Sequence, residues 1–148
     1  MRDPDEIKKL AYLRLDEAKI LCDAGKYNGA FYLAGYSVEL MLKAKVCEHL
    51  GIGDLFAGKE CKVAGIGDIK NAVQTHDIGI LLIFSGLRGR LADMSKDGIV
   101  MESYGLLLGV WSEKVRYQFV EQDAHKVKRL IELLSDKEKG LLAWIKKN

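Results

Sequence analysis

The stretch from Tyr27 to Leu50, YNGAFYLAGYSVELMLKAKVCEHL, limits the choice of folds more than any other part of the chain. It is nearly all apolar or small, and it is long enough for about six helical turns of about 3.6 residues each. In such a helix, apolar side chains point in every direction around the axis: Ala30, Phe31, Leu33, Ala34, Val38, Leu40, Met41, Leu42, Ala44, Val46 and Cys47. A helix that is hydrophobic all round belongs in the middle of a bundle. The sequence therefore predicts an all-α fold centred on this helix.

The main polar break in this central helix is Glu39 with Lys43. They form an i,i+4 pair in the favourable order, with the glutamate first. Tyr36 and Tyr32 lie one and two turns earlier on the same face. Two interpretations are open: an ordinary surface pair, or a pair that lines a cleft or a subunit contact.

The segment before the central helix has the signals of a complete helix. Asp3 is a candidate cap, Pro4 suits the first helical position, and Glu6 sits where a capping box requires it. Gly25 is the expected stop. Because the two helices are then joined by very few residues, they should form an antiparallel hairpin. The expected buried stripe is Ile7, Ala11, Leu15, Ala18 and Cys22.

The chain after Leu50 is glycine-rich and aperiodic, and we interpret residues 51–74 as a long connection with a helical turn near 68–74. A third helix is expected to start near Thr75 and His76, which would act as cap residues, and to continue to Met94. Residues 95–98 form a polar break.

A fourth helix is expected from about Val100 to Arg116, and residues 117–120 should form a turn. Its apolar stripe comprises Val100, Tyr104, Leu107, Leu108, Trp111 and Val115, and its opposite face comprises Gly98, Glu102, Gly105, Gly109, Ser112 and Arg116. The small residues on that face suggest close approach by another helix. A fifth helix should run from about Gln122 to Lys146, weakened by Gly140. The sequence thus predicts a five-helix up-and-down bundle in a single domain over residues 1–148.

Composition excludes several classes of protein. A formal net charge of +2 gives no case for wholesale attraction to nucleic acid. The cysteines, Cys22, Cys47 and Cys61, show no CxxC spacing, so reduced thiols in a cytosol are the simplest interpretation. We find no signal peptide at the charged start and no uncharged apolar run of about 18 residues. We therefore expect a cytoplasmic protein that does not cross a membrane.

Two local motifs lack part of the pattern that their functions require. Residues 53–59, GDLFAGK, have the spacing of a phosphate-binding loop, but Glu60 follows where serine or threonine is needed, and no strand precedes. His49, His76 and His125 show no metal-ligand spacing, so neither a metal nor a cofactor is expected. His76 beside Asp77 at a helix start is more typical of capping than of catalysis.

Arg116 and Tyr117 close the fourth predicted helix, near Trp111. Arg116 either neutralises the helix C-terminus or is presented at a cleft, where its planar guanidinium would bind phosphate. Sequence physics alone favours the first interpretation.

Three segments together resemble the HEPN family of small helical domains: AGKYNGAFYLAGYSVELMLKAKVC, THDIGILL and WSEKVRY. The resemblance implies a five-helix up-and-down fold, a homodimer and a cleft near the end of the fourth helix. It also implies either a minimal nucleotidyltransferase as partner, in a toxin–antitoxin-like pair, or a metal-independent RNase. Glu39 and Lys43 match the polar pair on the family's second helix, and His76–Asp77 the dipeptide that opens the third.

Arg116 matches the arginine of the RNase branch, in which a histidine follows closely. Here eight residues separate Arg116 from the next histidine, His125, which argues against RNase activity.

The leading hypothesis is therefore a HEPN-like, non-catalytic or weakly catalytic helical domain that dimerises and binds a nucleotide, an RNA or a nucleotidyltransferase partner. Arg116 would hold phosphate, Lys43 would add positive charge, and Glu39 would orient Arg116. Trp111 or Tyr117 would offer a stacking face.

Two alternatives stay open: an RNase that uses Arg116 and His125, and a structural interaction module in which Glu39, Lys43 and Arg116 form an internal salt-bridge network.

Overall fold

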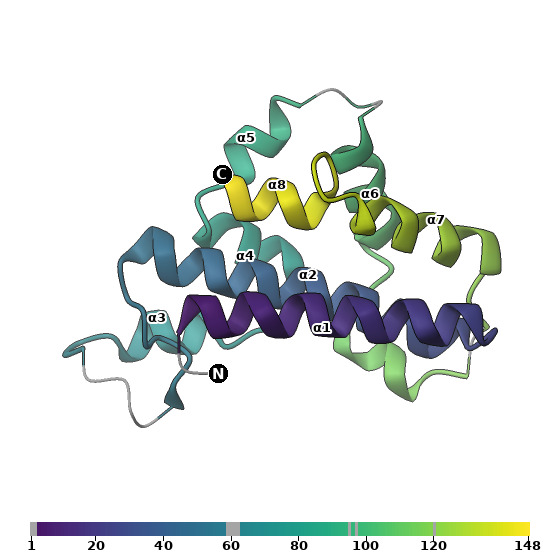
Figure 1. The fold of residues 1–148 in the computed structure, drawn as a ribbon. Helices are drawn as coiled ribbons and strands as arrows, with labels where there is room; N and C mark the ends of the chain where they lie inside the picture. Colours follow the sequence, from purple (N-terminus) through teal and green to yellow (C-terminus); the bar gives the residue numbers. More distant parts are fainter. Residues whose placement is uncertain (1–2, 59–62, 95, 97, 120) are drawn as a thin grey trace.

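The all-α prediction is confirmed. A computed structural model describes residues 3–58, 63–94, 96, 98–119 and 121–148, and its described regular structure is entirely helical. Figure 1 shows the arrangement. The elements are α1 (Pro4–Asp23), α2 (Tyr27–Leu50), α3 (Gly67–Val73), α4 (Ile78–Phe84), α5 (Arg88–Ala92), α6 (Ile99–Leu107), the 3-10 helix η2 (Glu113–Tyr117), α7 (Ala124–Ser135) and α8 (Leu141–Lys147). The described part of the chain thus contains shorter and more numerous helices than the five predicted.

The first two helices form the predicted hairpin, and α1 lies along α2 in Figure 1. Asp3 accepts a hydrogen bond from the backbone N–H of Glu6 at 2.8 Å, and Pro4 is the first helical residue. Gly25 has φ of +75° in the connecting turn, a conformation that glycine adopts without strain. All five residues of the predicted α1 stripe are buried.

Helix α2 is the core of the molecule, as its composition predicts. It packs against α1, α4, α7, α8 and η2, so nearly every side of it is covered. Its apolar residues are accompanied inside by two charged ones, Glu39 and Lys43. The surface-pair interpretation of Glu39 and Lys43 is therefore wrong.

The predicted third helix is two helices, and its cap is Asp77 rather than Thr75 or His76. The Asp77 side chain accepts from the backbone N–H of Ile80 at 3.1 Å. Gly86, with φ of +75°, separates α4 from α5. The ring of His49 packs so closely there that a Cβ added at Gly86 would lie 2.5 Å from its Cε1 atom. Of the predicted break at 95–98, residues 95 and 97 lie outside the described part of the chain.

The predicted fourth helix ends early. Helix α6 stops at Leu107 because Leu108 is extended and Gly109 has φ of +72°, which a right-handed helix cannot contain. The chain becomes helical again only at η2. Gly105 and Arg116 therefore do not share one helical face, which corrects the small-residue face expected from the sequence. The last residue of the expected turn over 117–120 lies outside the described residues.

The predicted fifth helix is also divided, close to the expected weak point. Asp136 accepts from the backbone N–H groups of Glu138 and Lys139 and closes α7, and Gly140 caps α8. A Cβ at Gly140 would lie 2.5 Å from the carbonyl oxygens of Asp136 and Leu133, so only glycine fits the bend. The inward residues expected from the sequence are buried: Val127, Leu130, Ile131, Leu134, Leu141, Leu142 and Ile145.

The connection after α2 contains α3, close to the predicted helical turn. Residues 59 and 60 of the rejected phosphate-loop motif, and Cys61, lie outside the described part of the chain. None of the described helices has the length and apolarity needed to cross a membrane.

Candidate functional site

One face of α2 is polar along most of its length. Tyr32, Tyr36, Glu39 and Lys43 follow one another at helical spacing, so their side chains share this face. Helix η2 packs against it, and His76, just before α4, contacts it from another direction. We refer to this part of the molecule as the polar face of α2.

Glu39 lies at the centre of the polar face and has no solvent exposure. Its Oε1 accepts from the Lys43 Nζ at 2.7 Å, and its two oxygens lie 3.0 and 3.1 Å from the Nδ1 of His76. A buried carboxylate is costly unless it is paired and hydrogen-bonded. Both requirements are met here, by Lys43 and His76 of the same chain.

His76 joins α2 to η2. Its Nε2 lies 3.0 Å from an oxygen of Glu113, while its Nδ1 faces Glu39. A carboxylate only accepts hydrogen bonds, so both contacts are donated together only when the ring is imidazolium. In that form two cations, Lys43 and His76, balance two anions, Glu39 and Glu113. His76 is thus a structural link, and the capping role expected from the sequence belongs to Asp77.

Lys43 is enclosed rather than presented to solvent. Its ammonium is bound to Glu39 and lies 5.6 Å from the centroid of the Phe56 ring, a cation–π contact. Lys43 therefore stabilises the buried Glu39 carboxylate and does not present its charge at a surface where a ligand could bind.

Arg116 lies at the other end of the polar face, on η2, and is exposed. Its guanidinium lies 3.5 Å from the Tyr32 hydroxyl and 4.7 Å from the centroid of the Tyr117 ring. No carboxylate among the described residues forms an ion pair with it. The predicted orientation of Arg116 by Glu39 is replaced by contacts with these two tyrosines.

Trp111 is buried and locked in place. Its indole N–H donates to the backbone carbonyl of Tyr32 at 3.0 Å, and its ring stacks on the Tyr32 ring. A Cβ added at Gly35 would lie 2.1 Å from the indole nitrogen, so the ring fills the space above this glycine. Of the two predicted stacking residues, only Tyr117, 71% exposed, has a free face.

Tyr36 lies between Tyr32 and Glu39 on the polar face, and charges at both ends of that face act on its phenol. Burial raises the pKa of its phenol, and the negative charge of Glu39 raises it further. Arg14 on α1 and Arg116 on η2 act in the opposite direction. Glu39 and Arg116 therefore influence the same hydroxyl, although they do not touch.

A cavity of about 690 Å³ lies beside the residues that contact the polar face, although none of its lining residues is on α2. His76 and Glu113 form part of its wall, together with Ser112, Lys114 and Gln118. The cavity gives solvent access to the His76–Glu113 pair, whereas Glu39 stays sealed behind it. Arg116 lies outside this wall.

The remaining predicted site residue, His125, is exposed near the start of α7. None of the contacts among the described residues joins it to Arg116. The described part of the chain also holds no group of histidine, cysteine and carboxylate side chains arranged to bind a metal ion.

Sequence reasoning identified Glu39, Lys43, Trp111, Arg116 and Tyr117 but missed their partners. His76 was assigned to a cap, and Glu113, Phe56 and Arg14 were given no role. The only usable signal was that a carboxylate inside an apolar helix needs more than one donor.

The chain was also compared with protein-family models, with curated proteins and with solved structures. None of the three comparisons gave a match.

Proposed function

We propose that the chain is a HEPN-like helical module that binds a nucleotide or RNA through Arg116 without cleaving it. The observation that carries this proposal is the exposed Arg116 guanidinium, which has no carboxylate partner among the described residues and lies beside the exposed ring of Tyr117. A guanidinium offers paired donors to phosphate. An adjacent aromatic ring offers a face for a base.

The order of the helices is consistent with the family resemblance. If α4 with α5, α6 with η2, and α7 with α8 are each counted as one unit, and α3 is assigned to the connection after α2, the described helices give the five units that the resemblance implies. On this grouping Arg116 is at the end of the fourth unit, where the resemblance implies a cleft.

The buried charges support the site rather than react. His76 ties Glu113, the first residue of η2, to Glu39 on the central helix. Trp111 anchors the chain just before η2. Because Arg116 is on this short helix, both contacts hold its backbone in position for a ligand.

The same geometry argues against catalysis. A general base must reach the proton that it removes. His76 has both ring nitrogens directed at carboxylates, and no hydrogen bond among the described residues joins His125 to Arg116.

The proposal is tested by fluorescence anisotropy with a labelled single-stranded RNA, titrated at several salt concentrations. Arg116→Gln should weaken binding at least tenfold and reduce the salt slope by about 0.7, the value for one phosphate contact on a single strand. Arg90→Gln is the matched control, because Arg90 is also exposed but contacts Asn148. Equal affinity of Arg116→Gln and wild type would refute the assignment.

The RNase alternative is tested with the same RNA in the presence of EDTA. Cleavage that disappears in Arg116→Ala would replace the binding module by a metal-independent RNase. Cleavage unchanged in Arg116→Ala would show that the activity does not come from this residue.

We also propose that the module forms a homodimer and pairs with a minimal nucleotidyltransferase. Support for a contact surface comes from exposed apolar side chains around η2, at Leu108, Val110 and Phe119. Large apolar side chains that are left exposed are candidates for a contact with another protein. Light scattering at micromolar concentration should show a dimer that Phe119→Ser weakens. A monomeric wild-type protein would refute the proposed homodimer.

The proposed nucleotidyltransferase partner is tested by co-purification with a nucleotidyltransferase encoded in the neighbouring reading frame.

A further inference from the structure

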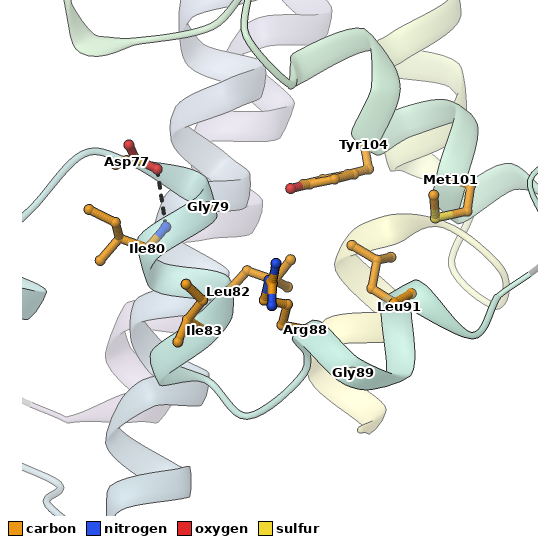
Figure 2. Close-up of a pocket in the computed structure, with 11 residues that line it drawn as sticks. Asp77, Gly79, Ile80, Leu82, Ile83, Arg88, Gly89, Leu91, Met101 and Tyr104 are labelled. Atoms are coloured by element: carbon orange, nitrogen blue, oxygen red, sulfur yellow. Dashed lines mark hydrogen bonds between the residues drawn. The ribbon is translucent and has the colours of Figure 1, made fainter.

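A second cavity, of about 480 Å³, lies between α4, α5 and α6 (Figure 2). It adjoins the cavity beside the polar face, since Asp77 and Gly79 border both. Its volume falls within the range of about 300–1,000 Å³ typical of small-molecule sites. None of the residues assigned to ligand binding above lines it.

The walls of this cavity are mainly apolar. Leu82 of α4 and Leu91 of α5 are buried and form its inner surface. Ile83 of α4 is 55% exposed and also lines the cavity, and Met101 of α6 lies near Leu91 (Figure 2). An apolar body that entered would therefore be removed from water by side chains of three helices.

Two polar groups converge on the apolar space. In Figure 2 the Arg88 side chain extends from the start of α5 into the gap between α4 and α6, and the Tyr104 hydroxyl points into the same gap from α6. The Arg88 side chain forms no hydrogen bond or ion pair with any described residue. Its charge nevertheless acts on the Tyr104 phenol.

The Tyr104 hydroxyl is a donor at neutral pH. Burial raises the pKa of this phenol, and the nearby charge of Asp77 raises it further, against the smaller opposing effect of Arg88. The Asp77 carboxylate itself is turned to the backbone, where it accepts from the Ile80 N–H at 3.1 Å (Figure 2). The cavity thus presents a guanidinium and a phenol O–H, both of which donate.

We propose that this cavity binds a small carboxylate with an apolar body, such as a medium-chain fatty acid. The carboxylate would accept from the Arg88 guanidinium, which suits its planar geometry, and from the Tyr104 hydroxyl. The hydrocarbon would lie against Leu82 and Leu91. A neutral ligand would leave the guanidinium unpaired, and an ammonium group would be repelled by it. This site is independent of nucleotide or RNA binding at Arg116.

The first test is isothermal titration calorimetry of the full chain with hexanoate and octanoate, and with 1-octanol and octylamine as head-group controls. Burial of each added methylene is worth about 0.8 kcal/mol, so affinity should rise about fourfold per methylene, or about 15-fold between the two acids. Octanoate should bind at least tenfold more tightly than 1-octanol, and octylamine should bind most weakly. No binding of octanoate at millimolar concentration, or preference for octylamine, would overturn the proposal.

The second test uses matched variants. Arg88→Gln should weaken octanoate at least tenfold and leave 1-octanol unchanged, whereas Arg90→Gln, on the same short helix, should leave both unchanged. Gly89→Leu should abolish binding of both ligands, because a Cβ at Gly89 meets no atom within 4 Å and the new side chain can grow into the cavity.

Gly67→Leu is the control for Gly89→Leu, since the space above Gly67 on α3 is equally open. Circular dichroism melts establish that each variant is folded. If Gly89→Leu is folded and binds octanoate as wild type does, the ligand is elsewhere and the proposal is wrong. Arg116→Gln should bind octanoate like wild type. The carboxylate site and the proposed function of Arg116 are therefore tested independently.

Discussion

Trp111 packs on Gly35 at a distance that no other residue at position 35 would allow. The indole nitrogen lies where a side chain would begin, 2.1 Å from an ideal Cβ, and its N–H donates to the carbonyl of Tyr32. The contact joins the middle of the longest helix to the segment that leads into η2. A glycine inside a helix lowers stability by about 1 kcal/mol relative to alanine, and here the close contact explains its presence.

Gly35→Ala should therefore destabilise the protein despite its better helix propensity. Overpacking of this kind costs about 1–3 kcal/mol, and the ring would also lose its hydrogen bond. We expect a net loss of about 2 kcal/mol in the free energy of unfolding, measured by urea denaturation. Gly105→Ala on α6 is the control, because nothing lies within 4 Å of its Cβ position. That variant should gain stability, and a gain in Gly35→Ala as well would contradict the packing argument.

The Glu39–Lys43 pair should show strong coupling in a double-mutant cycle. Glu39→Leu leaves Lys43 buried without its partner, and such a change costs about 3–5 kcal/mol. Glu39→Leu combined with Lys43→Met replaces both charges by apolar groups and should recover most of that loss. The free energies of unfolding measure the coupling, which we expect to exceed about 1 kcal/mol.

The comparison pair for this cycle is Glu102–Arg129, which joins α6 to α7 through two hydrogen bonds of 2.9 and 3.0 Å. It is exposed and screened by solvent, so breaking it should have a much smaller effect. Effects of equal size in the two pairs would show that burial of Glu39 is unimportant.

Cys47 should resist alkylation in the folded protein. Burial raises the pKa of its thiol to about 11. At pH 8 about one molecule in a thousand then carries the reactive thiolate at this position, compared with a sizeable fraction in the unfolded chain. Peptide mapping after iodoacetamide treatment should show Cys47 unmodified in buffer and modified in urea. Rapid modification in buffer would place this side chain near the surface.

Asp136 should contribute to stability at neutral pH and lose that contribution in acid. The N–H of Lys139 and then that of Glu138 donate to its carboxylate and hold its pKa below the usual value. A depressed pKa in the folded state gives stability that is full above about pH 4 and is lost as pH falls through the lower folded value. The unfolding free energy of Asp136→Ala should accordingly depend less on pH between about 4 and 2. A carboxyl NMR titration with an ordinary pKa would refute the argument.

The sequence was sufficient where structure is decided by neighbours along the chain. Asp3, Pro4 and Gly25 bound α1 as expected, and the apolar run from Tyr27 to Leu50 is the central helix with the predicted ends. Capping and periodicity act over one or two turns, and both can be read from residue types.

The predicted helix lengths were wrong where a particular glycine adopts a positive φ. Gly105 continues α6, whereas Gly109 adopts positive φ and ends the helical region, and helical periodicity treats the two alike. The expected fourth helix was too long for this reason. A glycine also divides the expected third helix, at Gly86.

The candidate site was predicted in part. Glu39 and Lys43 were found because charge inside an apolar run is visible in the sequence. Their link to Glu113 through His76 was not found, because these residues come from separate parts of the chain and only the folded backbone brings them together. Arg116 was found by resemblance, but its tyrosine neighbours follow from the position of η2.

The packing of His49 against Gly86 has a consequence for the carboxylate-binding cavity. The imidazole packs closely against Gly86 at the bend between α4 and α5. Arg88 is the first residue of α5, directly after this bend. The last turn of α2 therefore contacts the bend that precedes Arg88, ten residues beyond Glu39 along the same helix. We expect a substitution at residue 49 to change ligand binding in the cavity at Arg88 and to leave binding at Arg116 unchanged. The two sites could then be altered independently through residues of the same helix.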